Sequence, residues 1–166
     1  TTSVVSLSGS TASVNAAGSA LVTATFTPTD TANYVSGGTV TMTVSVATAD
    51  QSGLTITSLS GTYGSTITLA ASGGTTGGSV SYVTTGAGCS IASGALSKPS
   101  AGDCSVTATM AGNDNYNAVS SLATTVTFAK ASQSGLSVTT TSGTYGIDLT
   151  LNVGGGTTAG SVTYVV

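Results

Sequence analysis

The sequence predicts an all-β protein made of tandem antiparallel β-sandwiches, and three observations support this fold class. Apolar residues alternate with Thr and Ser at a period of two, which is typical of strands with one buried face. Glycine pairs at 73–74 and 77–78 punctuate the alternating runs, as turns do. No stretch of the sequence carries the 3.6-residue period of an amphipathic helix.

The expected strands follow from this alternation, taken in chain order. Apolar side chains fall on one face in the runs 22–26, 67–71, 104–110 and 149–153. The opposite face is mostly Thr and Ser, and Thr suits a pleated surface because its side chain is β-branched. These runs are short, so we expect each sheet to be assembled from several of them.

The composition excludes several classes of function. Ser and Thr make up 61 of the 166 residues, only seven residues are charged, and the chain has no His, Glu, Arg or Trp. The usual general bases and metal ligands are therefore missing, and we expect no enzymatic activity and no cofactor. Two lysines cannot follow a phosphate backbone, so we expect no nucleic-acid partner. No apolar run is long enough to predict membrane insertion in this segment.

An internal repeat organises the chain. Residues 51–84 match 133–166 at an offset of 82, with 21 of 34 positions identical. Residues 22–26 match 106–110 at an offset of 84, and residues 33–46 match 115–128 at an offset of 82. We therefore expect one complete repeat at 51–132, preceded by the C-terminal half of a repeat at 1–50 and followed by the N-terminal half of a repeat at 133–166.

The repeat also predicts how the units associate. About seven short strands in one unit of this length are typical of an antiparallel sandwich of immunoglobulin type. A half-sandwich leaves its apolar face and strand edges open. We expect each half to find its complement in a neighbouring copy of the chain, or in residues outside this sequence.

The two cysteines, Cys89 and Cys104, lie within the complete repeat. A bridge between them closes a loop of about 16 residues, which is worth about 3 kcal/mol in the chain-entropy model. A metal site would need further ligands that the chain lacks. We expect a disulfide, which indicates an oxidising compartment and therefore an extracellular or cell-surface location.

Four motifs stand out along the chain: the stretch Val22–Tyr34, the stretch 101–109 followed by Asn113–Tyr116, the Thr62-Tyr63-Gly64 start, and the strand Val80-Ser81-Tyr82 after a Gly-rich turn. Together they resemble bacterial immunoglobulin-like (Big-type) tandem repeats. The resemblance covers nearly the whole chain. It implies a spacer or structural array of a large surface protein, adhesin or stalk, with ligand binding often held in separate terminal modules and no catalytic residue.

Two sets of polar and aromatic residues invite a functional interpretation. Asp30 and Asp114 lie in polar loops, but Ca²⁺ needs six to eight oxygen ligands, so we interpret them as turn-forming residues. For the tyrosines we expect packing in the core, at sandwich corners or between domains, with the hydroxyls of Tyr34 and Tyr116 bonded to nearby backbone. They are Tyr34, Tyr63, Tyr82, Tyr116, Tyr145 and Tyr164.

The hydroxyl-rich surface leaves two interpretations open. Thr rows are candidate acceptors for O-linked sugars, or they lie in contacts with further copies of the repeat, where hydroxyls bond without burying charge. We expect a structural repeat segment of a bacterial extracellular fibre, filament or surface stalk that assembles end to end, and laterally where faces match. The alternative is an adhesin binding module that recognises carbohydrate or a host protein.

Overall fold

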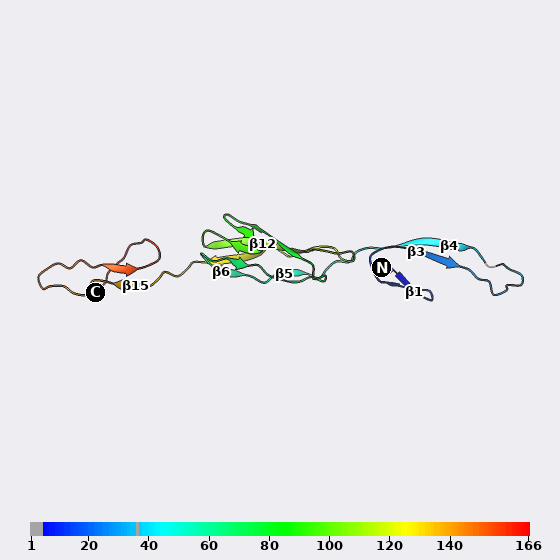
Figure 1. Cartoon of the computed structure of the whole chain (residues 1–166), viewed down its shortest axis with the longest axis horizontal. Helices are drawn as coiled ribbons and strands as arrows, with labels where there is room; N and C mark the ends of the chain where they lie inside the picture. The colour runs from blue at the N-terminus through cyan, green and yellow to red at the C-terminus, as the bar shows by residue number, and fades with distance from the viewer. Residues whose placement is uncertain (1–4, 36) are drawn as a thin grey trace.

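The computed structural model describes residues 5–35 and 37–166, apart from the side chain of Ser6. Within these residues the chain forms sixteen strands and no helix, so the all-β prediction is confirmed. With no helix among the described residues, no helical membrane span is present. The chain is elongated, with its N-terminal, central and C-terminal segments in a row (Figure 1).

The central segment, residues 51–132, holds most of the strands. They are β5 (Leu54–Ile56), β6 (Ser60–Thr62), β7 (Ile67–Thr68), β8 (Ala71–Gly73), β9 (Val80–Thr85), β10 (Ser90–Ala92), β11 (Ala95–Ser97), β12 (Gly102–Met110), β13 (Val119–Ser120) and β14 (Thr124–Ala129). The nine residues of β12 make it the longest of these, and β12 pairs antiparallel with β9, β13 and β14. Strand β6 extends this sheet by pairing parallel to β14.

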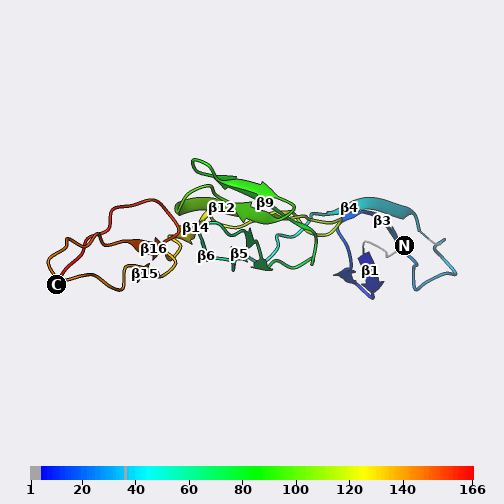
Figure 2. The ribbon, with the colours of Figure 1, turned by 60° about the vertical axis from the view of Figure 1, so that its left-hand side comes forward.

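Two smaller sheets complete the central segment. Strand β5 pairs with β8, and β7 pairs with the hairpin of β10 and β11. Figure 2 shows β5 and β6 on one side of the segment and β9 and β12 on the other. The alternation of β12 places Cys104, Val106, Ala108 and Met110 inward, as the sequence predicts.

A single apolar core joins these sheets. It combines four residues from the first part of the segment with seven from the second part, and Val106 and Val126 are fully buried in it. The members are Leu54, Ile56, Ile67, Leu69, Leu96, Cys104, Val106, Ala108, Met110, Val126 and Phe128. The core therefore depends on pairing between residues 51–85 and residues 86–132.

In their described residues, the two flanking segments form only two-stranded antiparallel pairs. The N-terminal segment has β1 (Val5–Ser8) paired with β2 (Thr11–Val14), and β3 (Gly18–Thr25) paired with β4 (Thr39–Val46). The C-terminal segment has β15 (Leu136–Val138) paired with β16 (Val153–Gly155). These registers repeat those of the central segment: Ala20 faces Val44 as Cys104 faces Val126, and Leu136 faces Gly155 as Leu54 faces Gly73.

A glycine pair shows why the local geometry is repeated. Gly73 and its counterpart Gly155 both have a positive φ, of 99° and 98°. A Cβ at Gly73 would collide with the carbonyl oxygen of Gly53, and one at Gly155 with that of Gly135. Only glycine combines a positive φ with room for so close a backbone, so the glycine that ends β8 and the one that ends β16 are required by the close approach of two backbones.

Some expected strands differ from the structure. The run 67–71 is divided between β7 and β8, which belong to different sheets, although Ile67 and Leu69 are both buried. In the run 149–153 only Val153 belongs to a strand. Strand β9 is present at 80–85, whereas its counterpart at 162–165 forms no strand. Within the described part of the chain, residues 149–152 and 162–165 have no neighbouring strand with which to form a ladder.

Candidate functional site: the joints between segments

The predicted disulfide is confirmed. Cys89 and Cys104 are bonded, with their Cα atoms 5.9 Å apart. Cys104 lies on the inward face of β12 and is almost fully buried, while Cys89 is half-buried in the loop before β10. Beside it, the ammonium of Lys98 donates a hydrogen bond of 2.6 Å to the carbonyl of Ala87. The bridge ties this loop to the central strand of the largest sheet.

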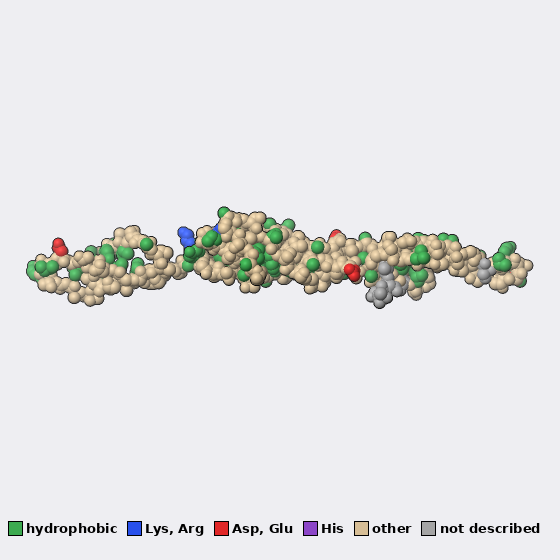
Figure 3. All heavy atoms as spheres, turned by 45° about the horizontal axis from the view of Figure 1, so that its top comes forward, with side chains coloured by type: hydrophobic (Ala, Val, Ile, Leu, Met, Phe, Trp, Pro, Cys, Tyr) green, Lys and Arg blue, Asp and Glu red, His purple; other side chains and the backbone are tan. Residues whose placement is uncertain are grey.

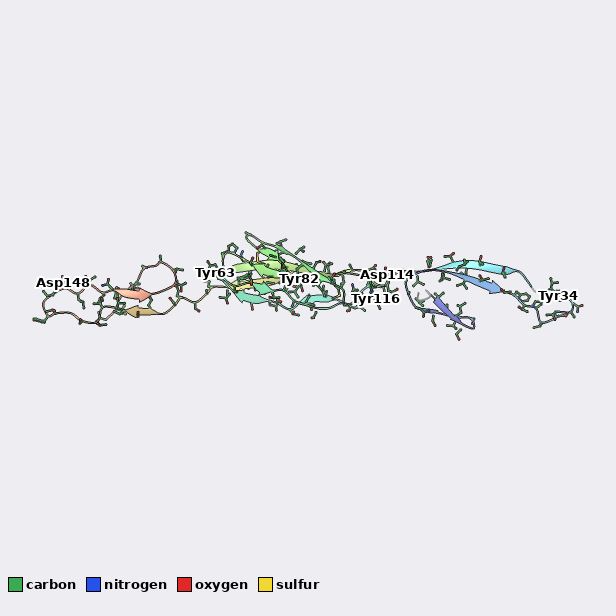
Figure 4. The ribbon with its side chains drawn as sticks, in the orientation of Figure 1. Tyr34, Tyr63, Tyr82, Asp114, Tyr116 and Asp148 are labelled. Carbon is green, nitrogen blue, oxygen red and sulfur yellow. A yellow bond between two sulfur atoms is a disulfide. The ribbon has the colours of Figure 1, made fainter. Side chains whose placement is uncertain are left out.

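The tyrosines occupy different environments (Figure 4). Tyr82 is half-buried against the core and Tyr116 is half-buried at the boundary with the N-terminal segment, whereas Tyr34, Tyr63, Tyr145 and Tyr164 are exposed. The Tyr164 hydroxyl donates to the carbonyl of Leu151 at 3.1 Å. Among the described residues, the hydroxyls of Tyr34 and Tyr116 form no such bond. The packing expected for these side chains remains a prediction.

The two polar loops form turns in different ways. Asp30 accepts hydrogen bonds from the backbone and side-chain nitrogens of Asn33, at 3.1 and 2.8 Å. The side-chain bond from Asn33 is the main cause that lowers the pKa of Asp30. In the second loop Asn113, not Asp114, accepts from the backbone of Asn115 and Tyr116. The described residues contain no cluster of three His, Cys, Asp or Glu side chains that could bind a metal.

The most connected polar region is the joint between the N-terminal and central segments. The backbone nitrogen of Ala49 donates to the carbonyl of Asn115, and the nitrogen of Asn117 donates to the carbonyl of Ala49, both at 2.8 Å. Ala49 and Tyr116 thus form a parallel β-bridge. A loop of the central segment is therefore bonded to the stretch of chain that follows β4 of the N-terminal segment.

Side chains reinforce this joint. The amide oxygen of Asn115 accepts from the backbone of Ala17 at 2.8 Å. The Asn117 side chain accepts from the hydroxyl of Thr48 at 2.6 Å and donates to the carboxylate of Asp50 at 2.8 Å. Each bond joins residues that are far apart in the sequence, so together they restrict the angle between the two segments.

Gln51, the first residue of the central segment, completes the joint and is almost fully buried, with 8% of its surface exposed. Its amide oxygen accepts from the backbone nitrogens of Thr75 and Thr76, at 3.0 and 3.1 Å. Its amide nitrogen donates to the carbonyls of Ala111 and Asn117, at 3.1 and 2.9 Å. Sequence reasoning missed this residue, although its recurrence in both Gln-Ser-Gly-Leu motifs was the available signal.

The second joint, between the central and C-terminal segments, repeats half of this arrangement. The Gln133 amide oxygen accepts from Thr157 and Thr158, at 2.7 and 3.2 Å. Its amide nitrogen donates to the Thr158 hydroxyl at 2.6 Å, and Gln133 is exposed. A groove of about 410 Å³ lies here. Its lining includes Tyr63, Pro99, Ala101, Lys130, Gln133 and Thr158.

Comparison with known proteins gives no relative. No family model matches the sequence, and neither a curated protein nor a solved structure matches it significantly. The function must therefore be argued from the joints and strands themselves.

Proposed function

We propose that this chain is a non-enzymatic structural repeat segment of a bacterial extracellular fibre or surface stalk, built from tandem immunoglobulin-like sandwiches that assemble end to end. The function is mechanical: β-ladders carry tension along the fibre, and bonded joints set the angle between successive units. The bacterial origin and the immunoglobulin-like class rest on the resemblance of the sequence motifs.

The observation that carries this proposal is the bonded joint between consecutive segments. Ala49 and Asn117 continue backbone hydrogen bonding from one segment into the next, and the buried Gln51 amide fixes the loops of the central segment that form its side of the joint. A flexible linker would leave these groups to water. An ordered joint between aligned segments is what a load-bearing array requires.

The surface composition agrees with a fibre that packs against itself. On the face that Figure 3 displays there are few charged side chains, and the rest of the surface is polar and apolar groups. With a net charge of −3 over 166 residues, repulsion between copies is weak, and low net charge favours association. Hydroxyl faces of this kind suit lateral contacts or O-linked sugars.

The disulfide supports an extracellular location. The Cys89–Cys104 bridge persists in an oxidising compartment, whereas cytosolic thiols are kept reduced. The binding-module alternative predicts an exposed aromatic or acidic cluster on one face. Of the described tyrosines, the most exposed are Tyr34, Tyr63 and Tyr145, and they lie in three different segments, so no observation favours that alternative.

Electron microscopy of the purified chain tests the proposal. We expect unbranched fibres with an axial repeat close to two sandwich lengths, because one chain covers about two periods of the repeat. Asn115→Ala should make them measurably more flexible, because it removes the bond to Ala17. Ser120→Ala is the matched control, since the Ser120 hydroxyl bonds Thr109 within the central segment at 2.8 Å. Compact monomers at every concentration would refute the fibre.

A further inference from the structure

We propose that residues 133–166 of one copy of this chain complete the sandwich begun by residues 5–50 of a second copy, through three defined β-ladders and one loop that enters a groove. This inference rests on the proposed fibre and specifies its contact. The central segment supplies the template, because there both halves are present in one chain.

Three ladders of the central segment join its first part to its second part: β9 with β12, β6 with β14, and β7 with β11. Within the described residues, none of the three has a counterpart in the flanking segments. Strands β2, β3 and β4 each pair with one neighbour only, which leaves open edges on the N-terminal segment. Residues 142–144, 149–150 and 162–165, the counterparts of the missing partners, form no strand.

The repeat offsets convert each ladder into a register between two copies. Met110 faces Val80 and Ala108 faces Tyr82 in the central segment, so Phe26 should face Val162 and Ala24 should face Tyr164 of the other copy. Leu96 faces Ile67, so Ala12 should face Leu149. The parallel pair Phe128 and Gly61 corresponds to Val46 and Gly143.

Apolar side chains of the flanking segments are exposed at positions whose counterparts are buried in the core of the central segment. Leu136 is 60% exposed, whereas its counterpart Leu54 is 4% exposed. Phe26 is 69% exposed, whereas its counterpart Met110 is 6% exposed. Covering such side chains is favourable by about 25 cal/mol per Å² of apolar surface, so both segments gain by association.

The open edges carry no protection against pairing. Strands exposed at sheet edges are commonly guarded by charged residues or proline, yet β2, β3 and β4 contain neither. In residues 133–166 the one charged side chain is Asp148, which Figure 4 places in the loop at the far end of the segment. Apart from Asp148, which directly precedes Leu149, no charged side chain lies along the facing strands.

The groove at the second joint is the place where we expect the loop at 33–34 of the second copy to bind. In the first joint the equivalent position is occupied by Asn115 and Tyr116, with Asn115 bonded to Ala17. The counterparts of this loop are Asn33 and Tyr34, and the counterpart of Ala17 is Ala101, which lines the groove. We infer that Asn33 and Tyr34 enter the groove and that the Gln133 amide nitrogen turns to the carbonyls of Thr27 and Val35.

Cross-linking between two variants that each add one cysteine to the bonded Cys89–Cys104 pair tests this register. Thr25 and Thr163 correspond to Thr109 and Ser81, which face each other across β12 and β9, and both flanking residues are exposed. After mild oxidation, a mixture of Thr25→Cys and Thr163→Cys chains should give a covalent heterodimer. Neither variant alone should give a comparable yield, and Ser81→Cys with Thr109→Cys in one chain is the intrachain positive control.

A mismatched mixture makes the test specific. Thr150 corresponds to Thr68, which pairs with β11 and not with β12, so Thr25→Cys with Thr150→Cys should cross-link at least tenfold less. Thr11→Cys with Thr150→Cys should cross-link, because Ala95 faces Thr68. Equal yields in matched and mismatched mixtures, or none in either, would overturn the inference.

A second measurement does not depend on cysteine. Phe26→Asp should raise the concentration needed for half-maximal association at least tenfold in sedimentation, because it places a carboxylate in the contact. Leu122→Asp is the control, since Leu122 is 87% exposed outside the three ladders. Fibres that persist while the matched cysteines fail to cross-link would refute this contact and leave the fibre standing. Cross-linked dimers without fibres would support the contact and refute the fibre.

Discussion

The central segment and the two flanking segments share one sequence pattern but differ in how their apolar faces are covered. Val126 is fully buried, while its counterpart Val44 is half-buried. Both lie on the second strand of equivalent antiparallel pairs, β12 with β14 and β3 with β4. The register within such a pair is thus the same in both segments, and it does not depend on whether the pair is covered by further strands. Burial requires ladders between residues far apart in the sequence, and those ladders exist only where both halves of the repeat are present.

Removing the disulfide, which only the central segment has, should change the stability of that segment more than any other substitution considered below. Cys89→Val with Cys104→Ala gives the central segment the residues found at the aligned positions, Val5 and Ala20. We expect the free energy of unfolding to fall by about 3 kcal/mol, because the loop constraint on the unfolded chain is lost. Denaturant unfolding followed by circular dichroism measures it. An unchanged midpoint would mean that the bridge adds no stability.

A matched valine pair compares the two regions directly. Val126→Ala should cost about 2 kcal/mol, because it removes two buried carbons and leaves a cavity. Val44→Ala should cost less than about 1 kcal/mol in dilute, dissociated chains. In assembled fibres the two losses should become similar, because the second copy covers Val44. Equal losses in dilute chains would show that Val44 is already covered.

The two glutamines provide a smaller comparison. Gln51→Leu should cost about 1–3 kcal/mol, because the backbone groups of Thr75, Thr76 and Ala111 lose their partner. Gln133→Leu should cost less than about 0.5 kcal/mol in the dissociated chain, where water reaches the same groups. Thermal unfolding of both variants measures the difference. Similar losses would contradict the half-complete second joint.

Acid should produce the smallest effect, confined to the loop at 30–34. The pKa of Asp30 lies below its ordinary value of 3.8, mainly because of the Asn33 side-chain bond. A carboxyl group with a lowered pKa stabilises the folded loop above the unfolded pKa, and this contribution is lost as the pH falls through the folded pKa. The NMR signals of the Asn33 side chain should titrate below pH 3.8, and Asn33→Ala should raise the Asp30 pKa. Titration above 3.8 in the unmodified chain would contradict this bond.

The sequence was sufficient for the all-β class, the inward face of β12 and the disulfide, because each depends on alternation or on residue type. It was not sufficient for the run 67–71, where alternation continues across a change of sheet and only tertiary pairing divides β7 from β8. Asn113 was also missed, because either Asn113 or Asp114 could form the turn and backbone geometry selects between them. Gln51 looked like an ordinary polar residue until its partners from two loops were known.

The position of the two lysines has a practical consequence. Lys130 lines the groove at the second joint, and Lys98 adjoins Pro99, which lines the same groove. In Figure 3 the positively charged side chains gather at this end of the central segment. Dyes or gold particles attached only to these two side chains would therefore mark each chain at a single axial level. Such marks would reveal the polarity of a fibre and the direction in which it elongates.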